Sequence, residues 1–255
     1  MNNRASRKLS IVTICYNSKK FIESTFESVR NQTDKNFEYV VIDGGSTDGT
    51  LGIIKNNEDI IDHWYSEPDD GIADAMNKGI EKSTGDYIIF LHSDDYFVDH
   101  ESTEKVLKAV VSGKDIVVFD VYVETEIGRS IPRTRKFNFY TKIKQPFCHQ
   151  GVVCKRRLFD DIGVFDTNFD ITMDYDFFLR AYYLNASCLI ISTPLSVFRN
   201  TGISSREDWE GLSERLGEEK EVHLKNCKSH RMRLLYRIWW FLYPLYRRFR
   251  YAIPR

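Results

Sequence analysis

The sequence DYIIFLHSDD, residues 86–95, joins a short apolar run to two neighbouring aspartates. An unbroken apolar run of this length predicts a strand that is covered on both faces, as in a parallel sheet. Two adjacent carboxylates repel each other, and a divalent cation removes that penalty because Mg²⁺ and Mn²⁺ prefer oxygen ligands. In open α/β sheets, ligands bind beyond the carboxyl ends of strands. The pair is therefore a candidate metal site; the alternative is a helix cap followed by a turn residue.

Strands and helices alternate on the N-terminal side of this stretch. Apolar runs predict strands at 9–15, 37–43 and 60–66, and apolar residues at helical spacing predict helices from about residues 18, 50 and 71. Alternation of this kind indicates a mostly parallel sheet with right-handed crossovers. The strand ends at Tyr16, Asp43 and Asp94 should then meet at one edge of the sheet.

Composition sets the broad class. A chain of 255 residues with 42% hydrophobic residues predicts one large α/β domain or two small ones. The net charge of −1 gives no overall attraction to nucleic acid, so we expect no nucleic-acid partner. Five cysteines without a Cys-x-x-Cys pair indicate reduced thiols in a cytosol-like compartment. The polar N-terminus up to Lys8 has no apolar signal-peptide core.

Two common nucleotide-binding motifs are absent from the sequence. A dinucleotide-binding Rossmann domain needs Gly-x-Gly-x-x-Gly after its first strand, where this chain has CYNSKK at residues 15–20. A P-loop needs a Gly-Lys-Ser/Thr triplet, which the chain lacks. What remains is a nucleotide site built from carboxylates and a metal.

An ordered set of short motifs resembles the family-2 glycosyltransferases of the GT-A fold. The set consists of SIVT and YN between residues 10 and 17, VIDGGSTD at 41–48, DGI and AMNKG between 70 and 79, GDY at 85–87 and SDD at 93–95. The resemblance covers roughly residues 8–200. It implies a Rossmann-like, mostly parallel central sheet flanked by helices, with an added C-terminal helical tail. It also implies that a sugar is transferred, with inversion, from a nucleotide-sugar donor, most simply a UDP-sugar. The implied cofactor is Mn²⁺ or Mg²⁺.

The resemblance assigns site roles residue by residue. The implied donor-binding residues are Thr13, Tyr16, Asn17, Asp43, Ser46, Asn77, Lys78 and Asp94. Tyr16 would stack on the base, Asp43 would accept a hydrogen bond from it, and Asp94 would face the ribose. Asp95 is the implied metal ligand. The alternatives are a core role for Tyr16 and a solvated helix lysine at Lys78.

The second half of the chain carries the implied acceptor side. His149 and Gln150 resemble a pair near the acceptor and the diphosphate, and Arg180 would pair with an acid or reach the diphosphate. Asp174 resembles the catalytic base, although the preceding Met173 stands where relatives often have Glu. A general base must lie within hydrogen-bond reach of the acceptor hydroxyl. The alternative is that Asp174 only stabilises a helix N-terminus.

The C-terminal segment combines aromatic and basic residues. From Lys228 to the end the chain has eight Lys and Arg and no Asp or Glu. Its apolar core is too short to span a bilayer, but its aromatic and arginine residues suit a membrane interface through residues 234–251. The alternative is a helix packed on the domain.

Together these features predict four regions and one activity. The regions are an N-terminal tail (1–8), a nucleotide-sugar-binding half (9–120), an acceptor-binding half (121–215) and a basic, aromatic helical tail (216–255). The expected protein is a metal-dependent hexosyl- or N-acetylhexosaminyltransferase acting on a lipid-linked or polysaccharide precursor. We expect it in the cytoplasm, on the inner face of the plasma membrane. The alternatives are a sugar-nucleotide-forming nucleotidyltransferase and a non-catalytic, membrane-associated binding module.

Overall fold

The computed structural model describes residues 8–199 and 208–252, so most of the expected N-terminal tail lies outside the described residues. The first half alternates strands and helices as the apolar pattern predicts. Its elements are β1 (Leu9–Cys15), α1 (Ile22–Arg30), β2 (Phe37–Asp43), α2 (Thr50–Asn56), β3 (His63–Ser66), α3 (Ile72–Lys82), β4 (Tyr87–Phe90), β5 (Tyr96–Phe97) and α4 (Ser102–Val110).

The second half begins with a long strand and ends with two long helices. Its strands and α-helices are β6 (Ile116–Thr125), β7 (Gly128–Ser130), β8 (Val152–Lys155), α5 (Arg156–Ile162), α6 (Met173–Tyr183), β9 (Cys188–Arg199), α7 (Trp209–Asn226) and α8 (His230–Ala252). Two short 3₁₀-helices, η1 (Phe139–Lys142) and η2 (His149–Gly151), lie between β7 and β8.

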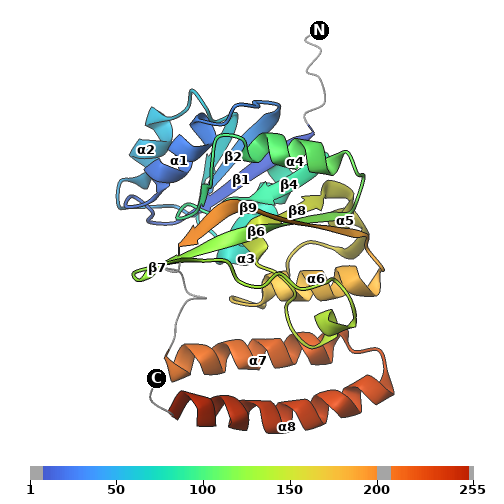
Figure 1. The fold of residues 1–255 in the computed structure, drawn as a ribbon. Coiled ribbons are helices and arrows are strands. Elements are labelled where there is room, and N and C mark those ends of the chain that lie inside the picture. The colour runs from blue at the N-terminus through green and yellow to red at the C-terminus, as the bar shows by residue number, and fades with distance from the viewer. Residues whose placement is uncertain (1–7, 200–207, 253–255) are drawn as a thin grey trace.

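The described strands form one sheet in the order β3-β2-β1-β4-β8-β6-β9-β5, with β7 paired to β6 (Figure 1). The four strands from β3 to β4 are parallel, and β9 is parallel to β6; β8 runs antiparallel between β4 and β6. The register of β1 and β2 pairs Cys15 with Asp43, so these strands end at the same level. The expected mostly parallel α/β sheet is confirmed.

Alternating side chains of the central strands fill two cores, one on each face of the sheet. Val12 and Ile88 point into the core that includes α3 and α6, whereas Ile11 and Ile89 point into the core that includes α1 and α4. Helix α3 lies very close to β1: a Cβ on Gly79 would meet the Val12 side chain at 2.4 Å. This close approach fixes α3, and with it one wall of the cleft described below.

Helix α1 begins later than the sequence predicts. Asn17 adopts a left-handed conformation with φ of 48°, and its amide nitrogen donates to Ser46 Oγ at 2.8 Å. The chain therefore turns toward the loop after β2 before the helix starts at Ile22. Ser18 still contributes at the start of the helix, because its carbonyl accepts from the amide of Ile22 at 3.1 Å.

Helices α7 and α8 form an antiparallel pair beyond α6, with α8 outermost (Figure 1). The inward side of α8 is anchored by Met232, Tyr236 and Trp240, which are buried against Leu216 of α7 and half-buried Ile143. In the described part of the chain, no helix combines the length and hydropathy needed to cross a membrane. The C-terminal segment is thus a helix packed on the domain, but only along one of its sides.

Candidate active site

A cleft of about 780 Å³ opens at the carboxyl ends of β1 and β4. Tyr16 and Asn17, directly after β1, line the cleft, and so does Asp94, four residues after the end of β4. Glu214 and Glu218 of α7 form part of its wall. Tyr16 is 63% exposed, so one aromatic ring is available to a ligand at this edge of the sheet. The strand order thus brings Tyr16, Asn17 and Asp94 together, as their positions at strand ends predict.

Asp43 is fully buried and organises the loop behind this edge. Ser46 Oγ donates to its carboxylate at 2.5 Å, and Ser66 Oγ donates to it at 2.6 Å. The side-chain oxygen of Asn17 accepts from the amide of Thr47 at 2.9 Å, which ties the end of β1 to the same loop. Asp43, Ser46 and Asn17 are therefore joined in one network.

Asp95 lies fully buried directly after the cleft residue Asp94. Its Oδ1 accepts from the amide of Arg199 at 3.2 Å, and the guanidinium of Arg199 donates to the carbonyl of Asp94 at 2.9 Å. Its Oδ2 is buried and has no hydrogen-bond partner among the described residues. Burial, reinforced by the charge of Asp94, raises the pKa of Asp95 well above its usual range.

The two acids fit a divalent cation. A buried carboxylate oxygen without a partner is unfavourable, and such atoms in native structures often await an ion or water. Within residues 8–199 and 208–252, no three His, Cys, Asp or Glu side chains form a ready-made metal cage. Mg²⁺ in nucleotide sites, however, is usually held by one or two carboxylates together with substrate phosphates. Asp95, with Asp94 beside it, supplies that donor set.

Two histidines stand between the cleft and the core. His92 lines the cleft, and its ring lies 5.6 Å from that of His149. His149 packs against Phe90 and Phe178, and neither ring nitrogen has a partner among the described residues. Burial lowers the pKa of His149 to about 3, so its ring is neutral. Gln150 follows it, and the Gln150 carbonyl accepts from Ser196 Oγ at 2.7 Å.

Asp174 lies in the first turn of α6 and is half-buried. The amide of Tyr175 donates to its carboxylate at 2.6 Å, and the Gln145 side chain donates to the other oxygen. Burial raises the pKa of Asp174 to about 6. A carboxylate with a pKa in this range is suited to proton abstraction near neutral pH.

Residues Cys148 and His149 lie between the end of β4 and helix α6. Burial raises the pKa of the Cys148 thiol to about 12, and the charges of Asp95 and Asp174 both add to the rise. His149 packs against Phe90 of β4 and Phe178 of α6, and Asp170 and Ile171, which lead into α6, line the cleft.

The N-terminus of α6 is held by a residue of α7. One carboxylate, that of Glu218, accepts hydrogen bonds from the backbone amides of Asp170, Ile171 and Thr172 at 2.8–3.1 Å. Thr172 is the N-cap of α6, so Glu218 fixes the segment that leads into the helix and satisfies the N-cap amide. Glu218 also lines the cleft, so the element that positions Asp174 is part of the site. No local sequence pattern indicates this role.

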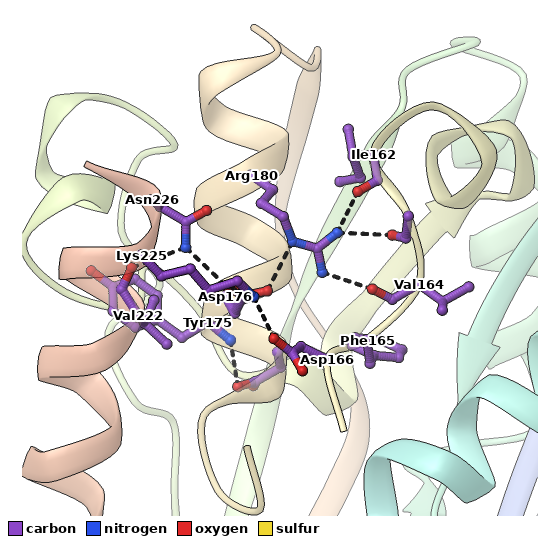
Figure 2. Close-up of polar contacts among 12 residues, drawn as sticks. Ile162, Val164, Phe165, Asp166, Tyr175, Asp176, Arg180, Val222, Lys225 and Asn226 are labelled. Carbon is purple, nitrogen blue, oxygen red and sulfur yellow. Dashed lines mark hydrogen bonds and ion pairs between the residues drawn. The ribbon is translucent and has the colours of Figure 1, made fainter. Parts of the chain in front are cut away.

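Arg180 pairs with an acid of its own helix, Asp176, which is one of the two roles expected for it. Its guanidinium donates to Asp176 at 2.8 Å and, at 2.5–2.9 Å, to three carbonyls at the end of α5 and just beyond it, those of Ile162, Gly163 and Val164 (Figure 2). Asp176 also accepts from Asn226 at 2.8 Å and pairs with Lys225 at 3.2 Å. This network holds α6 against α5 and α7.

Three further predicted donor residues are engaged elsewhere. The hydroxyl of Thr13 is fully buried and donates to the carbonyl of Leu91 at 2.7 Å, because Thr13 points to the opposite face of the sheet from Ile14. The Asn77 amide exchanges two hydrogen bonds with the Phe165 backbone. Lys78 bonds to a loop carbonyl and pairs with Glu67 and Asp74. Of the described residues that line the cleft, none is Thr13, Asn77 or Lys78.

Comparisons with known proteins agree with this architecture. Residues 10–168 match the family model described as Glycosyl transferase family 2. An "Uncharacterized glycosyltransferase" of Mycobacterium tuberculosis is 34% identical over 209 residues, which cover 78% of each chain. A "PGL/p-HBAD biosynthesis glycosyltransferase" of Mycobacterium bovis is 28% identical, with 82% of this chain and 80% of the relative covered.

Solved structures share the fold. S. aureus TarS 1-349 in complex with UDP-GlcNAc matches with a TM-score of 0.67 and 22% identity over 84% of this chain; the chain spans 64% of that fragment. Mannosyltransferase PcManGT from Pyrobaculum calidifontis, in complex with GDP-Man and Mn²⁺, matches with a TM-score of 0.66 and 16% identity, covering 90% of this chain and 67% of that one. Because the family model covers more than half of the chain and the solved structures share its fold, the chain belongs to glycosyltransferase family 2 and has the GT-A fold.

Proposed function

We propose that the chain is an inverting, metal-dependent transferase that moves a hexosyl or N-acetylhexosaminyl group from a UDP-sugar to an acceptor hydroxyl. The observation that carries this proposal is Asp174: a half-buried carboxylate with a raised pKa, three residues after Ile171, which lines the same cleft as Asp94. The nucleotide sugars in the TarS and PcManGT complexes support the donor class. The family match favours this activity over nucleotidyl transfer.

The donor would lie in the cleft with its base against Tyr16. The network of Asn17, Ser46 and Asp43 holds the loop beneath the base in shape. Asp94 faces the ribose, and Asp95 would hold Mn²⁺ or Mg²⁺ through its unpartnered oxygen. When bound, such an ion stabilises negative charge on the diphosphate as a Lewis acid.

The acceptor side is built around Asp174. Its carboxylate takes the proton of the acceptor hydroxyl while Gln145 and the Tyr175 amide keep it oriented. The hydroxyl oxygen forms the new bond to the anomeric carbon on the face opposite the diphosphate. The bond from that carbon to the diphosphate oxygen breaks, and the nucleoside diphosphate leaves with the electron pair. His149 and Gln150 stand on the diphosphate side, where neutral His149 backs the His92 ring.

A glycan or lipid-linked precursor is the proposed acceptor, presented at the inner face of the plasma membrane. The exposed aromatic and arginine residues of α8 support a site near a lipid surface.

Incubation with a panel of nucleotide sugars and Mn²⁺ tests the proposal by the nucleoside diphosphate released. We expect slow hydrolysis of one donor by the wild type, and none by Asp95→Ala or Asp174→Ala. Only Asp95→Ala should also weaken Mn²⁺-dependent donor binding. Asp160→Ala, at an exposed aspartate on α5, is the matched control and should retain wild-type activity. Full hydrolysis by either site variant would refute the assignment, and donor binding without turnover by the wild type would indicate a binding module.

A further inference from the structure

Helix α8 presents a continuous apolar surface to solvent. We define its outward face by Leu234, Ile238, Phe241, Leu242, Leu245 and Phe249, whose exposed fractions lie between 52% and 71%. At 3.6 residues per turn these six side chains fall within an arc of about 100°. Isolated exposed apolar residues are ordinary, but a stripe of this width along a helix marks a binding surface.

The opposite side of α8 is firmly held. Trp240 Nε1 donates to His223 Nδ1 of α7 at 3.0 Å, and the Tyr236 ring stacks on His223 with centroids 4.3 Å apart. Tyr236 also donates its hydroxyl to the Lys142 carbonyl at 2.6 Å. Because these buried contacts fix the rotation of α8, the outward face cannot turn toward the domain without breaking them. Its exposure is a property of the folded chain.

The charge on α8 has one sign. The helix contains six arginines, at positions 231, 233, 237, 247, 248 and 250, and no acidic residue. By helical spacing, Arg237 and Arg248 lie along one edge of the outward face. A second copy of the chain would bring the same arginines together, and like charges repel. An anionic surface, in contrast, attracts the arginines while the apolar side chains leave water.

We propose that the outward face of α8 docks on an anionic lipid bilayer, with the helix lying in the plane of the interface. A helix with one strongly apolar face and arginines beside it binds membranes in this way without spanning them. Helix α8 is the outermost element on its side of the molecule, which leaves it accessible to a flat surface (Figure 1).

Docking would place the cleft near the bilayer. Helix α8 packs on α7, and α7 lines the cleft through Glu214 and Glu218. Packed helices lie about 8–10 Å apart, so the membrane surface would be one helix layer from the cleft wall. This functional consequence depends on the proposed transfer to a membrane-presented acceptor, but the docking itself can be tested without any donor.

Flotation of the full chain with vesicles tests the proposal. We expect binding to vesicles of phosphatidylcholine with 30% phosphatidylglycerol, weaker binding to phosphatidylcholine alone, and release by salt. Phe241→Glu with Leu245→Glu should reduce partitioning at least about tenfold, since each replaced side chain loses its apolar burial. Arg237→Gln with Arg248→Gln should reduce it about fivefold per arginine. Ile127→Glu, at a residue 99% exposed in the β6–β7 turn, is the matched control and should float like the wild type.

Three outcomes would overturn the proposal: no flotation of the wild type on anionic vesicles, equal flotation of the Phe241→Glu and Leu245→Glu variant, or a wild-type dimer that this variant dissociates. The last would assign the face to a second copy. Donor hydrolysis without lipid, measured on the same variant, is expected at the wild-type rate. If the wild type does not hydrolyse a donor, the proposed transfer is contradicted, but the flotation result still tests membrane docking.

Discussion

Asp174 and Asp176 both lie in the first turn of α6. Substitution by asparagine should raise the stability of the protein at Asp174 and lower it at Asp176. Asp174 has a pKa of about 6 in place of the ordinary 3.8, so its charge at neutral pH opposes folding. At about 1.36 kcal/mol per pKa unit, the unfavourable contribution reaches at most about 3 kcal/mol at pH 7. Asp174→Asn removes the charge and keeps an oxygen for the Tyr175 amide. We therefore expect this variant to be more stable by up to that amount while losing transfer.

The stability gained by Asp174→Asn should depend on pH, because only the charged form of Asp174 is unfavourable. A carboxyl group whose pKa is raised by folding binds its proton more tightly in the folded state. Its penalty is therefore absent below about pH 3.8 and grows as the pH rises to about 6. The gain from Asp174→Asn should be about half as large at pH 5 as at pH 7. Urea unfolding at both pH values measures the gain, and a donor-to-acceptor transfer assay measures the loss of activity.

Asp176→Asn is the matched control. Asp176 is fully buried and paired with Arg180 and Lys225, so neutralising it leaves partly unpaired cations. The expected loss of stability is about 3–5 kcal/mol. If Asp174→Asn lowered stability at pH 7, or retained wild-type transfer, the assignment of Asp174 as a strained catalytic base would be wrong.

Other substitutions separate binding from structure. Tyr16→Ala should raise the Kd for the donor nucleotide about twofold to tenfold through lost stacking, measured by calorimetry; a Kd equal to that of wild type would remove Tyr16 from the base site. Arg180→Met should lower the unfolding free energy by about 3–5 kcal/mol and leave the nucleotide Kd of the folded protein unchanged, whereas a weakened Kd would support the diphosphate role. His149→Phe should keep stability within about 1 kcal/mol, because neither ring nitrogen is bonded in the described structure, and should slow donor hydrolysis. Unchanged hydrolysis would make His149 a core residue only.

The N-terminal half of the fold follows from local sequence pattern. The continuous apolar runs predict β1 and β2 with their observed ends, since buried parallel strands leave no alternating polar side. The predicted helical tail of 216–255 includes α8 and the second half of α7. The start of α7 at Trp209 was not predicted, because its apolar residues are sparse among charged ones and its burial depends on α6 and α8. The start of α1 was predicted four residues early, because the bonds from Asn17 to the loop after β2 are long-range.

The residues of the candidate site also fall into those that local sequence predicts and those that depend on long-range contacts. Tyr16 and Asp94 could be placed from strand ends alone, because parallel order brings those ends together. Glu218 and Gln145 could not, because each acts on a partner distant in sequence. The role of Arg180 had a local signal in its spacing of four residues from Asp176, which is typical of an ion pair on one helix face.

The hydrogen bonds from the start of α6 to Glu218 show that this part of the proposed site depends on α7. The segment that matches the family model ends at residue 168, before Asp174 and before the α7 carboxylate that seals the start of its helix. A fragment ending there would keep the strand ends of the proposed nucleotide site and lose Asp174, the proposed base. The proposed donor site and the proposed acceptor site thus lie in consecutive stretches of the chain, and only the second depends on α7.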